Sequence, residues 1–189
     1  NHLRNLRLIA PGGRCGEDPL SYAAAPTDCP QGNFQAFEAV LDSQRFHPLF
    51  LREMRAYGTL RFMPFLGIAD GYLNADRLGE PQQRIAWRDR SQLSDAQWAT
   101  GWQDGPPPYE LVFELASVLD ADIWMNLHFW ADDAFVQALA EFSRQHMPAG
   151  RLLYLEWNNE VWNGAPPYGW AGQRIDQWAE EKWPAAEYP

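Results

Sequence analysis

Lysine is nearly absent from this sequence of 189 residues, because Lys182 is the only lysine among its 15 basic residues. Acidic residues number 25, so the formal net charge is −10. An acidic chain lacks the basic surface through which proteins bind nucleic acids and anionic membranes. We therefore expect no nucleic acid and no membrane as partner. A neutral ligand suits the chain better than a polyanion, unless arginines cluster locally.

Long apolar runs and cofactor motifs are also missing. No run approaches the roughly 20 apolar residues that a membrane-spanning helix needs. The sequence has no GxGxxG at the start of a helix, no phosphate-binding loop, no HExxH and no CxxC, so it predicts no cofactor. A metal site from His128, Asp132 and Asp133 is conceivable. Such groups are common beside helix caps, however, and we expect no metal.

Two features bear on where the protein resides. The chain opens on residues 1–4 (NHLR) without an initiator Met or a signal peptide, so we expect it to be processed or cut from a longer chain. Cys15 and Cys29 lie in a segment rich in Gly, Pro and Ala. A disulfide between them would contribute on the order of 3 kcal/mol, and two free thiols are the alternative. A disulfide would indicate an oxidising compartment, and hence a secreted or periplasmic protein.

Short apolar runs alternate with helical patterns along the chain. This alternation predicts a parallel α/β sheet with crossover helices. Four βα units are half of a (β/α)8 TIM barrel, and we expect residues 1–189 to form the N-terminal half of one such domain. Strands are predicted at residues 5–10, 59–66, 123–127 and 152–155. Helices are predicted at residues 34–41, 48–57, 109–119, 134–146 and 168–182.

Polar and aromatic side chains crowd the end of the fourth predicted strand, in the stretch 151–164 (RLLYLEWNNEVWNG). A buried carboxylate must be paired or neutralised, so a core rarely collects acids in this way. The grouping therefore predicts a functional site. Its members are two carboxylates, two amides and two indoles: Glu156, Glu160, Asn158, Asn159, Trp157 and Trp162.

Tryptophan is abundant, with ten residues. Core packing accounts for Trp124 and Trp178, whereas other indoles lie in or beside predicted loops, where their flat faces could stack on sugar rings. The polar stretch from residue 67 to residue 108 is long enough to expect a function for it. Its aromatic residues form outer subsites or a lid that packs on itself, and both interpretations stay open. They are Trp87, Trp98 and Trp102, with Arg88 beside the first.

The segment 155–163 (LEWNNEVWN) resembles the E-Y-S-N-E-V-W-N segment of bacterial secreted proteins similar to clan A (4/7 superfamily) glycoside hydrolases. Glu-x-x-Asn-Glu at the end of the fourth barrel strand is the signature of that clan. Residues 59–63, with Arg61, are similar to its second strand. By pattern the resemblance covers residues 3–183, but its specificity lies in 155–163. It implies a bacterial glycoside hydrolase of which this chain holds the first half of the barrel.

The resemblance implies hydrolysis of β-glycosidic bonds in a neutral polysaccharide or oligosaccharide by a retaining two-carboxylate mechanism. Glu160 would be the acid/base, Asn159 would bind a ring hydroxyl, and Arg61 would orient the nucleophile, which is expected outside this chain. Glu156 is interpreted as a structural partner of an arginine such as Arg61 or Arg7. His128 is either a sugar ligand or a core histidine. The aromatic residues expected to contact substrate are Trp130, Trp157 and Trp162.

A second class of function stays open, namely a non-catalytic carbohydrate-binding protein kept for its aromatic cleft. In both cases the partner is a carbohydrate. Half a barrel also leaves two sheet edges open. We therefore expect the remaining half of the barrel, or a second copy of the chain, to cover those edges. Neither the sugar nor endo or exo action follows from the sequence.

Overall fold

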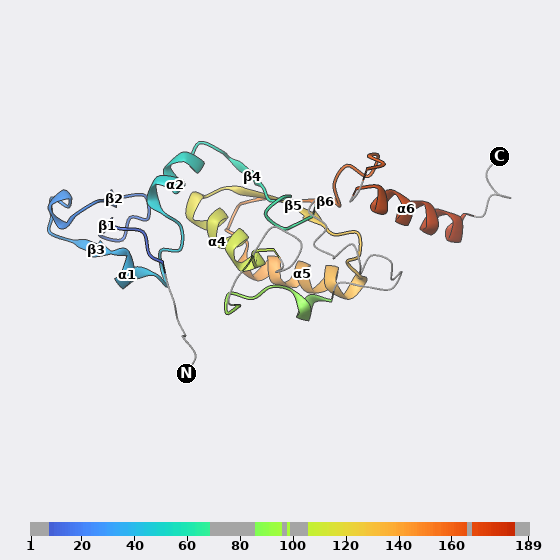
Figure 1. The fold of residues 1–189 in the computed structure, drawn as a ribbon, viewed down its shortest axis with the longest axis horizontal. Coiled ribbons are helices and arrows are strands. Elements are labelled where there is room, and N and C mark those ends of the chain that lie inside the picture. The colour runs from blue at the N-terminus through green and yellow to red at the C-terminus, as the bar shows by residue number, and fades with distance from the viewer. Residues whose placement is uncertain (1–7, 69–85, 96–97, 99–105, 166–167, 184–189) are drawn as a thin grey trace. The chain divides into compact units, whose positions relative to one another are not determined.

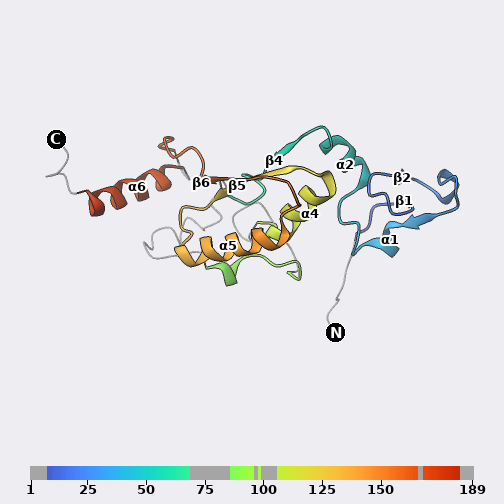
Figure 2. The same cartoon turned by 180° about the vertical axis from the view of Figure 1, so that it is seen from behind.

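The computed structural model describes residues 8–68, 86–95, 98, 106–165 and 168–183. The chain divides into two compact units, Asn1–Gly58 and Thr59–Pro189. Each unit contains its own three-stranded sheet, antiparallel in the first and parallel in the second (Figures 1 and 2). Within the described residues, no helix is both long and apolar enough to cross a membrane.

The first unit is an antiparallel sheet with a disulfide at one end. Its strand order is β2-β1-β3. Cys15, the last residue of the central strand, is bonded to Cys29, which follows a short helical turn. The disulfide therefore closes the segment that runs from the end of β1 through β2 and η1. The elements are β1 (Gly13–Cys15), β2 (Tyr22–Ala23), η1 (Pro26–Asp28), β3 (Phe34–Ala36), α1 (Phe37–Val40) and α2 (Pro48–Met54).

The second unit is a parallel sheet of order β4-β5-β6 with helices on one face. Ile123 and Met125 on β5 are fully buried, and α4 and α5 lie on one side of the sheet in both views (Figures 1 and 2). On the other face, Trp124 is 39% exposed and Tyr154 is 45% exposed, so no described helix covers them. The elements are β4 (Thr59–Arg61), η2 (Trp87–Asp89), α4 (Tyr109–Leu119), β5 (Asp122–Leu127), α5 (Asp133–His146), β6 (Leu153–Trp157) and α6 (Tyr168–Lys182).

Local signals explain where the helices of the second unit begin and end. Pro108 precedes the first residue of α4, and Asp120 ends that helix in the left-handed conformation, with φ 52°. The Asp132 carboxylate caps α5 by accepting a hydrogen bond from the Phe135 backbone N–H at 2.8 Å. Helices α4 and α6 have the predicted bounds, and α5 begins one residue before the predicted Ala134.

The prediction of four βα units from a TIM barrel is wrong. The first predicted strand falls partly outside the described residues. Its residues 8–10 are not in a strand, and Leu8 is fully exposed rather than buried in a sheet. Residues 34–36, predicted as helical, form β3 instead. The alternation of apolar runs does not reveal which strands share a sheet. Here the first unit pairs its strands antiparallel, which requires no crossover helix. Among the described residues, three strands are parallel.

Candidate functional site

The open face of the parallel sheet carries a row of side chains contributed by all three strands. Arg61 on β4 is in register with Trp124 on β5, and Trp124 is in register with Tyr154 on β6. Neighbouring strands lie about 4.8 Å apart, and residues two apart along a strand point to the same face. Asn126 and Glu156 therefore form the next row. We call these five residues the platform.

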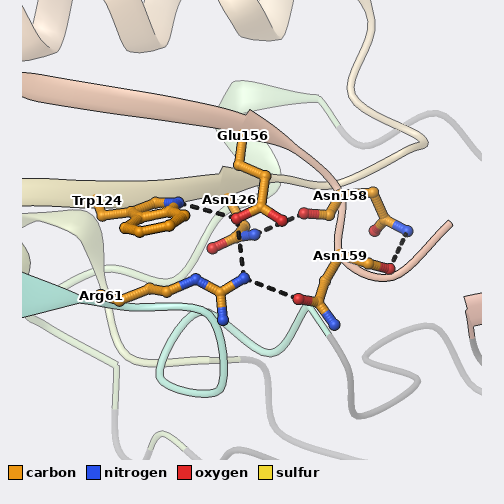
Figure 3. A network of polar contacts seen from close by, with 6 residues as sticks. All are labelled: Arg61, Trp124, Asn126, Glu156, Asn158 and Asn159. Carbon is orange, nitrogen blue, oxygen red and sulfur yellow. Dashed lines mark hydrogen bonds and ion pairs between the residues drawn. The ribbon is translucent and has the colours of Figure 1, made fainter.

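Arg61 joins the platform to the turn that follows β6 (Figure 3). Its Nη2 donates hydrogen bonds to Glu156 Oε2 and to Asn159 Oδ1, both at 2.8 Å. The Trp124 indole N–H donates to the same Glu156 oxygen at 2.9 Å. The guanidinium also lies 5.0 Å from the centroid of the Trp124 ring, a cation–π geometry. One arginine on β4 therefore fixes groups from β5, β6 and the turn.

The Glu156 carboxylate is held in its ionised form. Burial raises its pKa, but the hydrogen bonds donated by Arg61, Asn126 and Trp124 outweigh burial, so the pKa lies below the usual value. Arg61 is one of the two arginines that the sequence suggested as its partner, and Arg7 lies outside the described residues. Because the carboxylate and the guanidinium are paired, the platform carries no net charge.

The turn after β6 has an unusual backbone. Asn158 and Glu160 both adopt positive φ, 55° and 46°. The Asn158 N–H donates to the Leu127 carbonyl, and Asn126 Nδ2 donates to the Asn158 carbonyl, both at 2.6 Å. Asparagine tolerates this conformation, whereas it is strained for glutamate. As a result Asn159 is buried beside Arg61, while Glu160 is exposed and accepts a hydrogen bond from Asn163 Nδ2 at 3.2 Å.

Several amide atoms near this turn lack partners among the described residues. They are buried, and they belong to the platform and the turn: Asn126 Oδ1, Asn158 Oδ1 and Asn159 Nδ2. Buried polar atoms of folded proteins nearly always have partners, so a cluster of this kind calls for an explanation. Buried polar atoms without a hydrogen-bond partner therefore gather at the carboxyl end of the parallel sheet, within the described part of the second unit.

The structure places His128 below the surface. Only 7% of the residue is exposed, and burial lowers its pKa to about 3. Its Nδ1 accepts a hydrogen bond from the Trp130 backbone N–H at 3.2 Å, and its ring stacks on Phe129 with centroids 4.6 Å apart. The Trp130 ring in turn packs on Phe129 at 5.1 Å. His128 and Trp130 thus belong to an aromatic cluster rather than to the open platform.

The structure separates the two remaining predicted tryptophans from the platform. Trp157 follows Glu156 on β6, so it points to the opposite face of the sheet. Trp162 lies in the loop beyond β6 and is 79% exposed. Trp87, proposed for an outer subsite, packs against core aromatics instead. Its neighbours are Tyr109, Phe135 and Phe142, at centroid distances of 5.3 to 5.5 Å.

Sequence reasoning missed Trp124 and Tyr154, the two aromatic residues of the platform. Core packing was expected for Trp124, which is instead 39% exposed on the open face. The available signal was strand alternation: Trp124 lies two residues before a polar residue, Asn126, within one strand. The same rule puts Tyr154 on the face of Glu156. Of the other predicted outer-subsite residues, Trp102 lies outside the described residues.

Comparison with known proteins gives this chain no relative. No protein family, no curated protein and no solved structure matches it. The predicted resemblance to clan A glycoside hydrolases is therefore wrong: no match supports it, and the two small sheets are not half of a barrel. A similarity of nine residues is too short to assign a family. In the described part of the chain, no group of three or more His, Cys, Asp or Glu side chains could hold a metal ion.

Proposed function

We propose that the platform binds a neutral carbohydrate. Trp124 and Tyr154 lie in register on neighbouring strands and are both partly exposed. Aromatic rings combine an apolar face with a polar edge, which suits the alternating C–H and O–H groups of a sugar ring. Adjacent rings on a rigid sheet would hold such a ligand at little cost in conformational entropy.

The charged groups of the platform favour a neutral ligand over an ionic one. Arg61 offers donors and Glu156 offers acceptors, and sugar hydroxyls can use both. Since the two side chains already neutralise each other at 2.8 Å, an ionic ligand would have to compete with this pair. The net charge of the chain, −10, also disfavours an anionic ligand.

One observation carries the proposal: the row of Arg61, Trp124 and Tyr154 lies on the sheet face that no described helix covers. Exposed aromatic rings beside paired polar groups on a regular scaffold are typical of ligand sites. A sheet face that served only stability would instead be apolar and covered, since parallel sheets are normally buried on both sides.

The test is binding to a panel of neutral polysaccharides, measured by isothermal titration calorimetry with wild type and Tyr154→Ala. The Tyr154 side chain is 45% exposed and makes no hydrogen bond to another described residue, so its removal should leave the fold intact. We expect the variant to bind at least about tenfold more weakly. The matched control is Tyr57→Ala, at an exposed tyrosine of the first unit. Equal affinity of wild type and Tyr154→Ala, or no binding to cellulose, xylan, mannan or β-1,3-glucan, would rule the proposal out.

A second candidate function is hydrolysis of the bound β-glycoside with Glu160 as acid/base. The strained backbone of Glu160, φ 46°, favours this role, because strain of this kind concentrates at functional sites. Its carboxyl group would protonate the glycosidic oxygen and then activate water. Retention needs a second carboxylate about 5–5.5 Å away. The pairing of Glu156 with Arg61 and Trp124 suits a supporting role, so another residue would have to be the nucleophile.

Glu160→Gln separates hydrolysis from binding alone. The substitution keeps the size and hydrogen bonding of the side chain but removes its proton transfer. If Glu160 is the acid/base, turnover of a polysaccharide should fall by about 10²- to 10⁴-fold while the affinity stays unchanged. Glu38→Gln, at an exposed glutamate of the first unit, is the control. Equal turnover by Glu160→Gln and wild type would exclude the role.

The disulfide supports a proposed location outside the cytosol. Disulfides persist in oxidising compartments and are rare in reducing ones, and the bond between Cys15 and Cys29 spans 14 residues of a unit with a small core. We propose a secreted or periplasmic protein. Fractionation of the native source should recover it outside the cytosol, and recovery in the cytosol with free thiols would contradict the proposal.

A further inference from the structure

A concave surface lies on the side of β6 opposite the platform. It is a hollow of about 420 Å³ between the loop after β5, the end of β6 and helix α6. Apolar and aromatic side chains form most of its wall, and Trp157 and Trp178 are 42% and 44% exposed. The described residues that line it are Phe129, Ala131, Trp157, Arg174, Ile175 and Trp178. Its volume is within the range of small-ligand sites.

Arg174 is the one charged residue in this described lining. It lies one turn before Trp178 on α6, so both side chains share a helix face. The residue is half-buried, and it makes no hydrogen bond, ion pair or ring contact within the described part of the chain. The other arginines of this unit for which partners are described have acidic ones: Arg61 pairs with Glu156, Arg88 with Asp89, Arg90 with Glu110, Arg144 with Glu141 and Arg151 with Asp120.

A half-buried guanidinium beside exposed indoles favours a particular kind of ligand. The guanidinium can bind a carboxylate through two parallel hydrogen bonds, which are stronger than bonds between neutral groups. The indoles can stack on the ring that carries the carboxylate. The platform differs, because its arginine is already paired.

We propose that the hollow binds the uronic acid residue of an acidic oligosaccharide, with its carboxylate on Arg174 and its ring against Trp157 and Trp178. This inference rests on the proposed function in that it assigns the ligand to the carbohydrates, and it adds a second, acid-specific site. The platform binds neutral sugar residues and the hollow binds a charged one.

The test compares trigalacturonate with its fully methyl-esterified form, which keeps the ring and removes the charge. Calorimetry should find the acid bound by wild type more tightly than the ester, with an affinity that falls as salt is added. Arg174→Gln should lower the affinity for the acid about ten- to hundredfold, to that of the ester, and leave the affinity for the ester unchanged. Arg174→Lys should keep part of the difference in affinity between the acid and the ester. Arg88→Gln, at an exposed arginine, should have no effect.

The outcomes separate this inference from the proposed function. Equal binding of acid and ester, or unchanged binding in Arg174→Gln, overturns the inference, and binding of a neutral polysaccharide that depends on Tyr154 would still stand. Binding of ferulate, an aromatic carboxylate, without binding of trigalacturonate also overturns it, because the ligand would then not be a sugar. Loss of both acid and ester binding in Trp157→Ala, with an unchanged melting temperature, supports the stacking that we infer.

Discussion

Different interactions stabilise the interior of each unit. The first unit buries few apolar side chains, among them Phe37 and Leu51, and its centre contains a buried arginine. Arg14 donates to Gln35 Oε1 at 2.9 Å and to Gln44 Oε1 at 3.1 Å, and the disulfide closes the sheet. The second unit buries an apolar layer between β5 and helices α4 and α5, with Ile123, Met125, Phe113 and Leu139 among its side chains.

The difference shows what polar side chains do in each unit. In the first unit the buried polar groups and the disulfide compensate for a small core. In the second unit the apolar layer supplies the stability, so the polar platform on the open face is not needed to hold the sheet together. All ten tryptophans lie at residue 87 or later. Tryptophan fluorescence therefore reports the second unit alone.

The largest expected effect comes from opening the apolar layer of the second unit. Phe113 on α4 is buried and packs edge-to-face on Phe142 at 5.4 Å. Phe113→Ala should lower the free energy of unfolding by about 3–5 kcal/mol, because it leaves a cavity. Urea denaturation followed by tryptophan fluorescence measures this. Phe50→Ala, the same change at an exposed position of the first unit, should leave the transition in place. A shift below about 1 kcal/mol for Phe113→Ala would contradict the comparison.

The next effect is confined to the first unit. Replacing Cys15 and Cys29 together by alanine should destabilise that unit by about 3 kcal/mol, because the unfolded chain regains the entropy of the open loop. Hydrogen exchange at the amides of β1 and β3 should become fast, while the fluorescence transition keeps its midpoint. Wild type treated with reductant should behave in the same way. If the fluorescence midpoint moved to lower urea, the two units would not be independent.

These differences also explain what could be predicted from the sequence. Helices α4, α5 and α6 depend on local signals, such as the proline before Tyr109 and the cap at Asp132, and their bounds were predicted to within a residue. The positions of β5 and β6 were predicted for the same reason. The pairing of strands is not local. Nothing near Phe34 reveals that it pairs antiparallel with Cys15, so the sheet of the first unit was missed.

The site was predicted in part. The need to pair a buried acid suggested Arg61 or Arg7 as the partner of Glu156, and the side chains of Arg61 and Glu156 are in contact. The indole of Trp157 was grouped with Glu156 because it is adjacent in sequence, although adjacent residues of a strand face opposite ways. Side chains on one face come from neighbouring strands. Finding Trp124 beside Arg61 therefore requires the register between β4 and β5.

Acid is expected to destabilise the second unit, to an extent comparable with the loss of the disulfide from the first. The pKa of His128 is lowered to about 3 by burial, whereas an unfolded histidine titrates near 6.5. The unfolded chain therefore binds the proton first, and stability falls as the pH drops below about 6.5, by about 1.4 kcal/mol per pH unit until the folded pKa is reached. Fluorescence-detected urea transitions between pH 7 and pH 4 measure this slope.

His128→Asn keeps an acceptor near the position of Nδ1 and removes the titrating group. The free energy of unfolding of this variant should therefore depend less on pH between pH 7 and pH 4. His146→Asn, at an exposed histidine of α5, is the matched control and should keep it. A wild-type midpoint that does not change between pH 7 and pH 4 would show that the buried ring is protonated as readily as an exposed one.

The smallest effect tests whether the platform is dispensable for stability. The pKa of Glu156 is below its usual value, so its contribution is present above the unfolded pKa of about 4.3 and is lost as the pH falls through the lower, folded value. Because the pair with Arg61 is partly exposed, with side-chain exposures of 36% and 32%, Glu156→Gln should cost no more than about 1 kcal/mol at pH 7. The same substitution should weaken carbohydrate binding, and the two results together separate binding from stability. A loss of several kcal/mol at pH 7 would mean that the second unit, like the first, depends on buried polar groups.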